Sequence, residues 1–160
     1  MTEEIDTKDI EILRMLRKDS RTPMGTIGEA LHISKATVSR RIARMEEDGI
    51  IQGYRLSLDQ TKLGLMKSMV SLQVVGAPVS VVIEQLSSVR EIKNIFKAFG
   101  DHHLVCEVYT RNVDHLYDLI QSKLLNMPSI RSVEVNVLVE KMPRNPDADL
   151  DMYSEHNNIK

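Results

Sequence analysis

The order of hydrophobic patterns between residues 68 and 143 constrains the fold of this chain more than any other feature of its sequence. Apolar residues alternate in some segments and recur at helical spacing in others. The expected order is strand, helix, strand, strand, helix, strand, over residues 68–75, 78–89, 92–99, 103–110, 112–126 and 132–141. This order predicts a ferredoxin-like βαββαβ domain, in which two helices cover one face of a four-stranded antiparallel sheet. Because the other face is left uncovered, we expect it to pair with a second subunit.

Residues 1–53 predict three short helices. The expected N-caps of these helices are Asp6, Thr22 and Ser34. Gly49 is suited to end the third helix, because a residue without a side chain adopts the left-handed conformation at the least cost. A short turn between the second and third helices is typical of a helix-turn-helix. The sequence therefore predicts an α+β protein, with a three-helix, winged helix-turn-helix domain ahead of the ferredoxin-like domain.

The remaining segments are expected to connect and extend these two domains. Residues 50–59 alternate like a strand, with Gly53 as a break. Residues 54–67, which include the second half of this segment, are interpreted as a linker strand or hinge. The ferredoxin-like domain is expected to span residues 68–143. Residues 144–160 are polar and acidic with little periodicity, so we expect a tail that is ordered only through contacts with a partner.

The helix expected at residues 35–48 combines an apolar stripe with a basic face. At about 100° per residue, the residues on the apolar side are Val38, Ile42 and Met45. Arg40 stands on the opposite side between two small residues, Ala36 and Ala43. This arrangement would let the helix approach the floor of a DNA major groove, where arginine pairs with guanine. Acidic residues 46–48 oppose the helix dipole and are expected to point away from DNA.

Expected DNA contacts therefore cluster on this helix and beside it. Base-edge contacts are expected from Ala36, Thr37 and Arg40. Contacts nearer the phosphates are expected from Lys35, Ser39, Arg41 and Arg44, with Ser34 at the cap and Arg21 in the adjoining turn. Arg41 lies toward the core boundary and equally fits a structural ion pair with an acid such as Asp9. A merely solvated helix face is the competing interpretation of the whole surface.

Composition limits the other classes of function. The formal net charge is −2 and the sequence pI is about 6.2, so any contact with nucleic acid must come from a local basic patch. A single cysteine, Cys106, excludes an intrachain disulfide framework, and no Cys/His spacing suits a structural zinc. We expect no metal and no cofactor. The acidic start of the chain, and an interrupted uncharged run at residues 68–83, predict a cytoplasmic protein without a membrane partner.

Specific residues of the N-terminal half resemble the DNA-binding domain of the Lrp/AsnC, or feast/famine, transcriptional regulators. The matching positions are Asp6, Asp9, Ile12, Leu13, Arg21, Ser34, Val38, Arg41, Gly49-Ile-Ile-x-Gly-Tyr and Leu63-Gly64. The βαββαβ half is similar to the effector-binding and oligomerisation domain of that family. The resemblance implies a transcriptional regulator that binds pseudo-palindromic double-stranded DNA as a homodimer, or as a tetramer or octamer. It also implies modulation by an amino acid or a related metabolite.

The same resemblance locates a tentative effector site. Family members commonly carry Gly-x-x-Asp in the loop between the middle strands, and here Gly100 matches whereas His103 replaces the aspartate. Val135 stands in place of a family threonine. The tentative effector-binding residues are Gly100, Asp101, His102, His103 and Val135. A neutral histidine cannot supply the charge that would hold an ammonium group. Three alternatives follow for the ligand: Asp101 takes over the role of the family aspartate, the ligand is a different one, or no ligand binds. For the histidine pair, the alternatives are a plain polar loop and a metal site that includes Asp101.

Two other functions compete with the regulator. Sirohaem decarboxylases resemble the same two-domain arrangement, and the adjacent pair His102 and His103 keeps an enzyme in consideration. The basic, groove-shaped helix face argues against that alternative, so we expect no catalytic residues. A non-specific architectural DNA-binding protein is the second alternative, and the sequence does not separate it from a specific regulator.

Overall fold

The computed structural model describes residues 4–157 and residue 159. Contacts divide the chain into two compact units. Of the described residues, 4–57, 143–157 and 159 belong to the helix-turn-helix unit, and 58–142 belong to the sheet unit. The C-terminal segment is therefore part of the helix-turn-helix unit, and the expectation of an irregular tail that depends on a partner is wrong.

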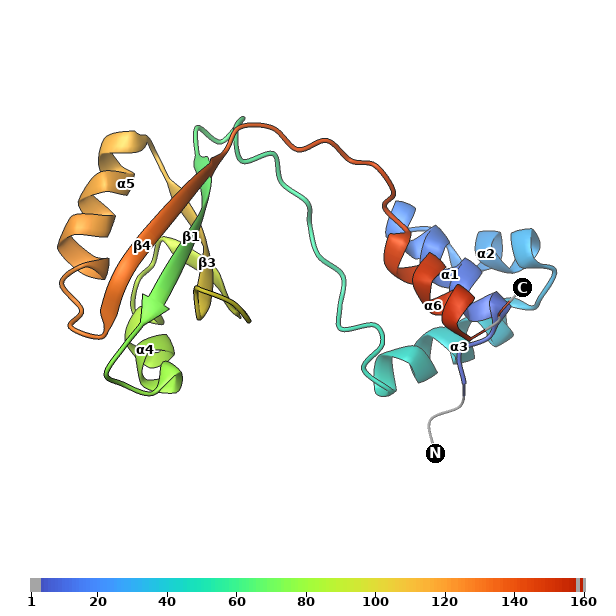
Figure 1. Cartoon of the computed structure of the whole chain (residues 1–160). Helices are drawn as coiled ribbons and strands as arrows, with labels where there is room; N and C mark the ends of the chain where they lie inside the picture. The colour runs from blue at the N-terminus through green and yellow to red at the C-terminus, as the bar shows by residue number, and fades with distance from the viewer. Residues whose placement is uncertain (1–3, 158, 160) are drawn as a thin grey trace. The chain divides into compact units, whose positions relative to one another are not determined.

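Four helices build the helix-turn-helix unit (Figure 1): α1 at Thr7–Lys18, α2 at Met24–Leu31, α3 at Lys35–Glu47 and α6 at Ala148–His156. Asp6 caps α1 as predicted, and its carboxylate accepts from the backbone N–H of Asp9 at 2.9 Å. Ser34 caps α3 by accepting from the N–H of Thr37 at 3.0 Å. Gly49, with φ of 72°, follows the end of α3 in the left-handed conformation, as expected.

Two local predictions for this unit are wrong. Pro23, not Thr22, is the N-cap of α2, because the Thr22 hydroxyl donates instead to the carbonyl oxygen of Asp19 at 2.7 Å. Residues 50–59 form no strand, although their sequence alternates. A strand requires a neighbouring backbone for its hydrogen bonds, and within the described chain no segment pairs with this one.

The core of the helix-turn-helix unit draws on all four of its helices. Its buried apolar residues are Ile5, Ile10, Ile12, Ile27, Val38, Ile42, Met45 and Leu150. Because Leu150 is part of this core, the C-terminal segment folds onto the helix-turn-helix unit. A nine-residue helix is too short to be stable in isolation, so α6 depends on this packing.

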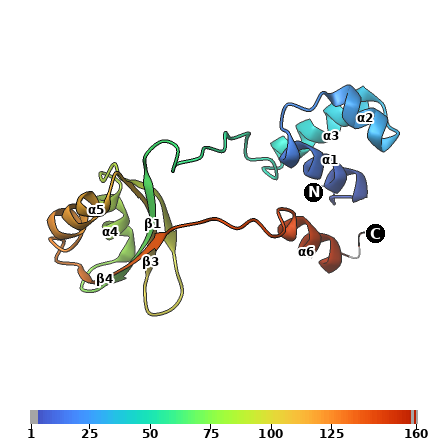
Figure 2. The same cartoon turned by 90° about the horizontal axis from the view of Figure 1, so that it is seen from above.

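The sheet unit has the predicted ferredoxin-like topology. Its elements are β1 at Met66–Val74, α4 at Val79–Leu86, β2 at Ile92–Lys97, β3 at Leu104–Thr110, α5 at Val113–Leu119 with a π-helical turn at Ile120–Leu124, and β4 at Ile130–Leu138. The antiparallel strand order is β2-β3-β1-β4. Figure 2 shows α4 and α5 on one side of this sheet.

Alternate strand residues pack under the two helices. They include Val70, Leu72, Val74, Leu104, Cys106 and Val108, all of which are buried. Cys106 is therefore a core residue, as expected, and burial raises the pKa of its thiol to about 11. A thiol with so high a pKa stays protonated near neutral pH and is a poor nucleophile.

The uncovered face of the sheet is largely polar, and a buried carboxylate lies at its centre. Glu107 on β3 accepts hydrogen bonds from Asn94 at 2.6 Å and from the Tyr109 hydroxyl at 2.7 Å. The ammonium group of Lys67 on β1 lies 2.7 Å from the same carboxylate. A face built in this way would meet a second subunit through hydrogen bonds and ion pairs more than through an apolar patch.

We expect acid to destabilise the sheet unit as the pH falls from 4.5 to about 2. Burial is the largest single influence and would raise the pKa of Glu91 and Glu107. The hydrogen bonds and positive charges around each carboxylate, led by Lys123 for Glu91 and by Lys67 for Glu107, together outweigh burial and lower both pKa values from 4.5 to about 2. The folded state thus favours the charged form. The stability that each carboxylate contributes is complete above pH 4.5 and is lost as the pH falls through about 2.

Urea unfolding between pH 2 and 7 measures this loss, which amounts to about 3 kcal/mol per group. The variant Glu107→Gln should show a flatter dependence of unfolding free energy on pH than the natural chain. An identical pH dependence for the two proteins would contradict the assignment.

Candidate nucleic-acid interface

Helix α3 presents the two faces that its sequence predicts. Val38, Ile42 and Met45 are buried against α1 and α2. The residues of α3 that are exposed on the other side include Lys35, Ala36, Ser39, Arg40 and Ala43. The long Arg40 side chain therefore projects from a surface of small residues, and nothing on that surface prevents close approach to a groove.

Arg41 and Arg44 lie on the flank of α3 and are held by acids of α1. The Arg41 guanidinium lies 2.7 Å from the carboxylate of Asp6 and 2.9 Å from that of Asp9. Arg44 donates a short hydrogen bond to the second oxygen of Asp9. Asp9 is fully buried, so its charge requires these partners. Of the two interpretations of Arg41, the structure supports the ion pair, and it places Arg44 in the same network.

Opposing effects act on the pKa of Arg41. Burial lowers it, whereas the hydrogen bonds to Asp9 and Asp6 raise it, and the net direction is upward. The guanidinium is therefore charged at all relevant pH values, and it fixes α3 on α1. This network sets the angle at which α3 is presented.

The other basic residues expected near phosphates have different surroundings. The Arg21 side chain is 91% exposed, with its Nε atom 3.7 Å from Asp19. Lys35 is exposed at the first position of α3. Ser34 and Thr37 bond to each other through their hydroxyls at 2.8 Å, so both take part in the cap. Of the basic side chains predicted to contact DNA, Arg21, Lys35 and Arg40 are therefore the exposed ones that lie outside the Asp9 network.

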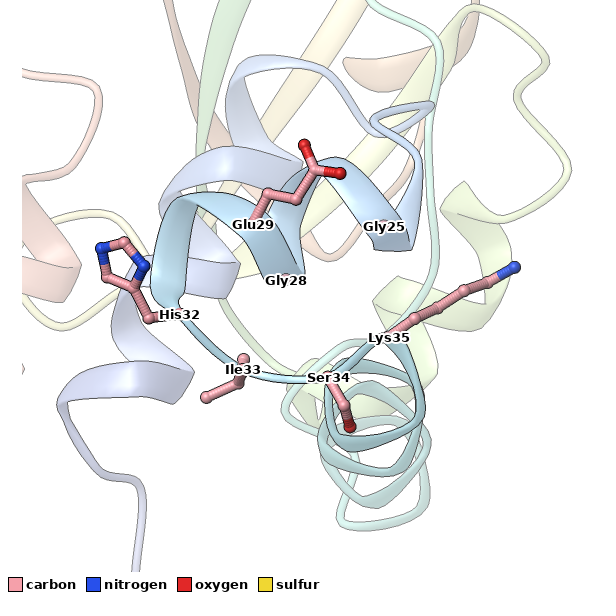
Figure 3. A pocket seen from close by; sticks show the side chains of 7 residues that line it. All are labelled: Gly25, Gly28, Glu29, His32, Ile33, Ser34 and Lys35. Carbon is pink, nitrogen blue, oxygen red and sulfur yellow. The ribbon is translucent and has the colours of Figure 1, made fainter.

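A hollow opens beside the turn between α2 and α3 (Figure 3). The residues that line it are Gly25, Gly28, Glu29, His32, Ile33, Ser34 and Lys35. His32 ends α2 with φ of 55°, and Lys35 points away from it at the other end of the hollow. The N–H of Ile33 donates to the carbonyl oxygen of Gly28 at 2.9 Å. This bond sets the path of the turn into α3.

Replacing Gly28 by alanine is expected to destabilise the helix-turn-helix unit by about 1 to 3 kcal/mol. A Cβ atom at this position would lie 2.6 Å from the carbonyl oxygen of Ile33, which belongs to the backbone and cannot move without opening the turn. Gly25→Ala is the matched control, because a Cβ atom there meets nothing within 4 Å. Alanine favours helix, so the control should be neutral or slightly stabilising. Thermal unfolding distinguishes the two, and equal midpoints would contradict the close approach.

Glu46, one of the acids expected to face away from DNA, has a structural partner. The Tyr54 hydroxyl donates to its carboxylate at 2.9 Å. Burial and this hydrogen bond both raise the pKa of Tyr54. The start of the linker is thereby fastened to the C-terminal end of α3, which gives a reason for an acid at that end of the helix.

The tentative effector residues do not converge on one site within the chain. The Nδ1 atom of His103 accepts a hydrogen bond from the N–H of Val74 at 3.0 Å, so this ring, one residue before β3, is held at the end of β1. His102 lies 3.6 Å from Glu134 on β4. Val135, the next residue of β4, packs against the helix-covered core instead. Gly100 and Asp101 lie exposed in the loop between β2 and β3.

Among residues 4–157 and 159, no three histidine, cysteine, aspartate or glutamate side chains are grouped to hold a metal ion. Asp101, His102 and His103 thus form no such group. Across that described range, no helix is long and apolar enough to cross a membrane.

Comparisons with known proteins identify the family. A winged helix-turn-helix DNA-binding domain matches residues 5–52, and the Lrp/AsnC ligand-binding domain matches residues 67–147. The HTH-type transcriptional regulator LrpA of Pyrococcus horikoshii is 30% identical over 141 residues, which cover 86% of this chain and 99% of that protein. The fold and the site thus define a helix-turn-helix regulator with a C-terminal ligand-binding domain. The chain belongs to the Lrp/AsnC family of transcriptional regulators.

Solved structures show the same fold. AsnC of Escherichia coli superposes with a TM-score of 0.81 at 22% identity, over 89% of this chain and 99% of that one. A transcriptional regulator from Neisseria meningitidis, solved as a complex with L-methionine, has a TM-score of 0.81 at 16% identity, over 92% and 99% of the two chains. At these identities the likeness establishes the fold alone.

Helix α6 is the element of this region that sequence reasoning missed. Its signal was weak, because Leu150 is the one large apolar residue that it buries among acids. The stronger signal lay outside the C-terminal segment, in two arginines of α1. Arg14 and Arg17 lie one turn apart on α1, and the acids that bind them are Asp147, Asp149 and Asp151.

Proposed function

We propose that this protein is a sequence-specific regulator that reads DNA with α3. Arg40 would contact base edges, with Ala36 and Thr37 beside it, while Lys35, Ser39 and Arg21 lie nearer the phosphates. Arg41 and Arg44 act indirectly, by holding α3 on α1 through Asp9. The single observation that carries the proposal is the exposed Arg40 standing between small residues, directly opposite the buried stripe of α3.

The proposed functional form is a homodimer that binds two half-sites. If the uncovered face of the sheet pairs with a second copy through its hydrogen-bonding and charged groups, two-fold symmetry would place two α3 helices on a pseudo-palindromic site. Membership of the Lrp/AsnC family supports assembly into dimers and larger oligomers.

An amino acid or related metabolite is the proposed effector. The Neisseria meningitidis relative was solved with L-methionine, which supports this class of ligand. The Nδ1 atom of His103 accepts from the backbone of Val74, so this atom is not available to accept from a ligand ammonium group in place of the family aspartate. Asp101 is exposed in the same loop and carries the negative charge that would hold an ammonium group.

Selection of bound sequences from a random DNA pool, with and without an amino-acid mixture, tests the function. A consensus with two-fold symmetry is the expected result, and its enrichment should change when the mixture is present. Retention of DNA without any consensus would favour the architectural alternative. Loss of the amino-acid response in Asp101→Asn, with the consensus unchanged, would support the role of Asp101.

A further inference from the structure

Helix α6 lies outside what the family match accounts for. The Lrp/AsnC ligand-binding match ends at residue 147, and α6 begins at Ala148. The alignment with the Pyrococcus horikoshii regulator covers 99% of that protein but 86% of this chain. This chain therefore carries residues with no counterpart in that relative, and α6 requires an explanation of its own.

Specific contacts hold α6 on α1. The Arg17 guanidinium binds Asp149 with both of its terminal nitrogens, at 2.7 and 2.9 Å, and donates to the carbonyl oxygen of Pro146 at 2.8 Å. Arg14 binds Asp151 at 2.7 Å. The hydrogen bond to Asp149 raises the pKa of Arg17. Bidentate pairing specifies geometry as well as charge, so α6 occupies a defined place on α1.

Docking of α6, which is non-covalent, turns the segment after β4 into a second tether between the helix-turn-helix unit and the sheet. Lys67 near the start of β1 pairs with Leu138 at the end of β4, so both connections leave the same end of the sheet (Figure 1). The first connection runs to β1 from Tyr54, whose hydroxyl donates a hydrogen bond to Glu46. The second runs from β4 to Pro146, whose carbonyl oxygen accepts a hydrogen bond from Arg17.

The second connection is the shorter of the two. Residues 139–145 reach at most about 25 Å when fully extended, whereas residues 55–65 reach about 40 Å. With α6 docked, the shorter segment limits how far a helix-turn-helix unit can move from its sheet. With α6 released, each unit would gain about 15 Å. Two units of a dimer would gain about 30 Å together, which approaches the 34 Å between successive turns of DNA.

We propose that α6 is a clasp that restricts the spacing of the two DNA half-sites. Its docking makes residues 139–145 the limiting tether, so a dimer accepts one half-site spacing and rejects a site that is wider by a full turn. The clasp rests on the proposed function, because spacing has meaning only for a dimer that reads two half-sites. It adds a determinant of DNA specificity that lies far along the chain from α3, the helix proposed to contact the bases.

Lengthening the tether without disturbing α6 tests the clasp. One variant carries about twelve Gly-Ser residues inserted between Pro143 and Arg144. The control carries the same segment appended after residue 160. Each protein is titrated with the selected DNA site and with the same site widened by about ten base pairs between its half-sites.

The natural chain and the control should lose at least about tenfold in affinity on the wider site, and the insertion variant less than about threefold. Equal losses in all three proteins, with specific binding intact, would overturn the clasp and leave the proposed function standing. Failure of the natural chain to prefer any sequence would overturn the proposed function, and the spacing role with it.

A charge reversal provides an independent test of the docking contact. Arg17→Glu should expose the amides of α6 to hydrogen exchange and widen the accepted spacing, as the insertion does. Adding Asp149→Arg should restore part of the protection and part of the selectivity. Loss of α6 protection with unchanged spacing selectivity would contradict the clasp.

Discussion

Replacing Arg40 by alanine is expected to weaken binding to the specific DNA site by about 1 to 3 kcal/mol, and to relax the preference for the base pair that it contacts. Arg40 is exposed on α3 and takes no part in the core, so the fold should keep its stability. The loss comes from a bidentate contact with a base edge, which the neighbouring Ala36 and Ala43 cannot replace because their side chains are small. Titrations with the selected site and its single-base-pair variants measure both effects.

Lys35→Ala is the matched control for this experiment. Lys35 lies at the start of the same helix and is expected near a phosphate, so its loss should weaken binding to all DNA sequences alike. It should also reduce the slope of log affinity against log salt concentration by about one. The two variants thus separate reading of bases from attraction to the backbone. Unchanged affinity in both variants across a salt titration would contradict the assignment of α3 to the groove.

Asp9→Ala is expected to destabilise the helix-turn-helix unit by about 3 to 5 kcal/mol. The Asp9 carboxylate is fully buried and binds both Arg41 and Arg44, so its removal takes one carboxylate partner from each of two guanidinium groups in a partly buried place. It also removes a hydrogen bond from the backbone N–H of Asp6, which belongs to the capping box of α1. DNA binding should fall with stability, because the network holds α3 on α1.

Denaturant unfolding of the full chain measures this effect, with Glu47→Ala as the control. Glu47 is an exposed acid at the end of α3, so its loss should change the unfolding free energy by less than about 0.5 kcal/mol. A loss below about 1 kcal/mol for Asp9→Ala would show that the network contributes little. Arg40→Ala, which should lose affinity without losing stability, separates a contact with DNA from support of the helix.

The arginines of α3 show where reasoning from sequence reached its limit. Helical periodicity correctly placed Arg40 opposite the buried stripe, and it placed Arg41 and Arg44 at the flanks. It could not assign the flanking pair between phosphates and acids, because the partner, Asp9, lies on another helix. A flanking arginine has the same sequence signature in both roles, and the difference appears only when α1 and α3 are packed together.

The loop between β2 and β3 shows a similar limit. The exchange of the family aspartate for His103 was visible in the sequence and cast doubt on the usual effector contact. The structure adds that the His103 ring bonds to the backbone of Val74, and that Val135 faces the helix-covered side of the sheet. These facts depend on strand register, which sets the face of every residue and is not evident from a single strand.

By itself the sequence determined the order of elements, the buried stripe of α3, the caps at Asp6 and Ser34, and the ferredoxin-like topology. Each of these depends on the spacing of residues within one segment, where periodicity and capping chemistry act. Only the tertiary structure decided which charges meet, that residues 50–59 form no strand, and that the acidic C-terminal segment becomes α6. Those outcomes depend on distant partners, because Leu150 and its neighbouring aspartates form a helix only where α1 offers them an apolar core and two arginines.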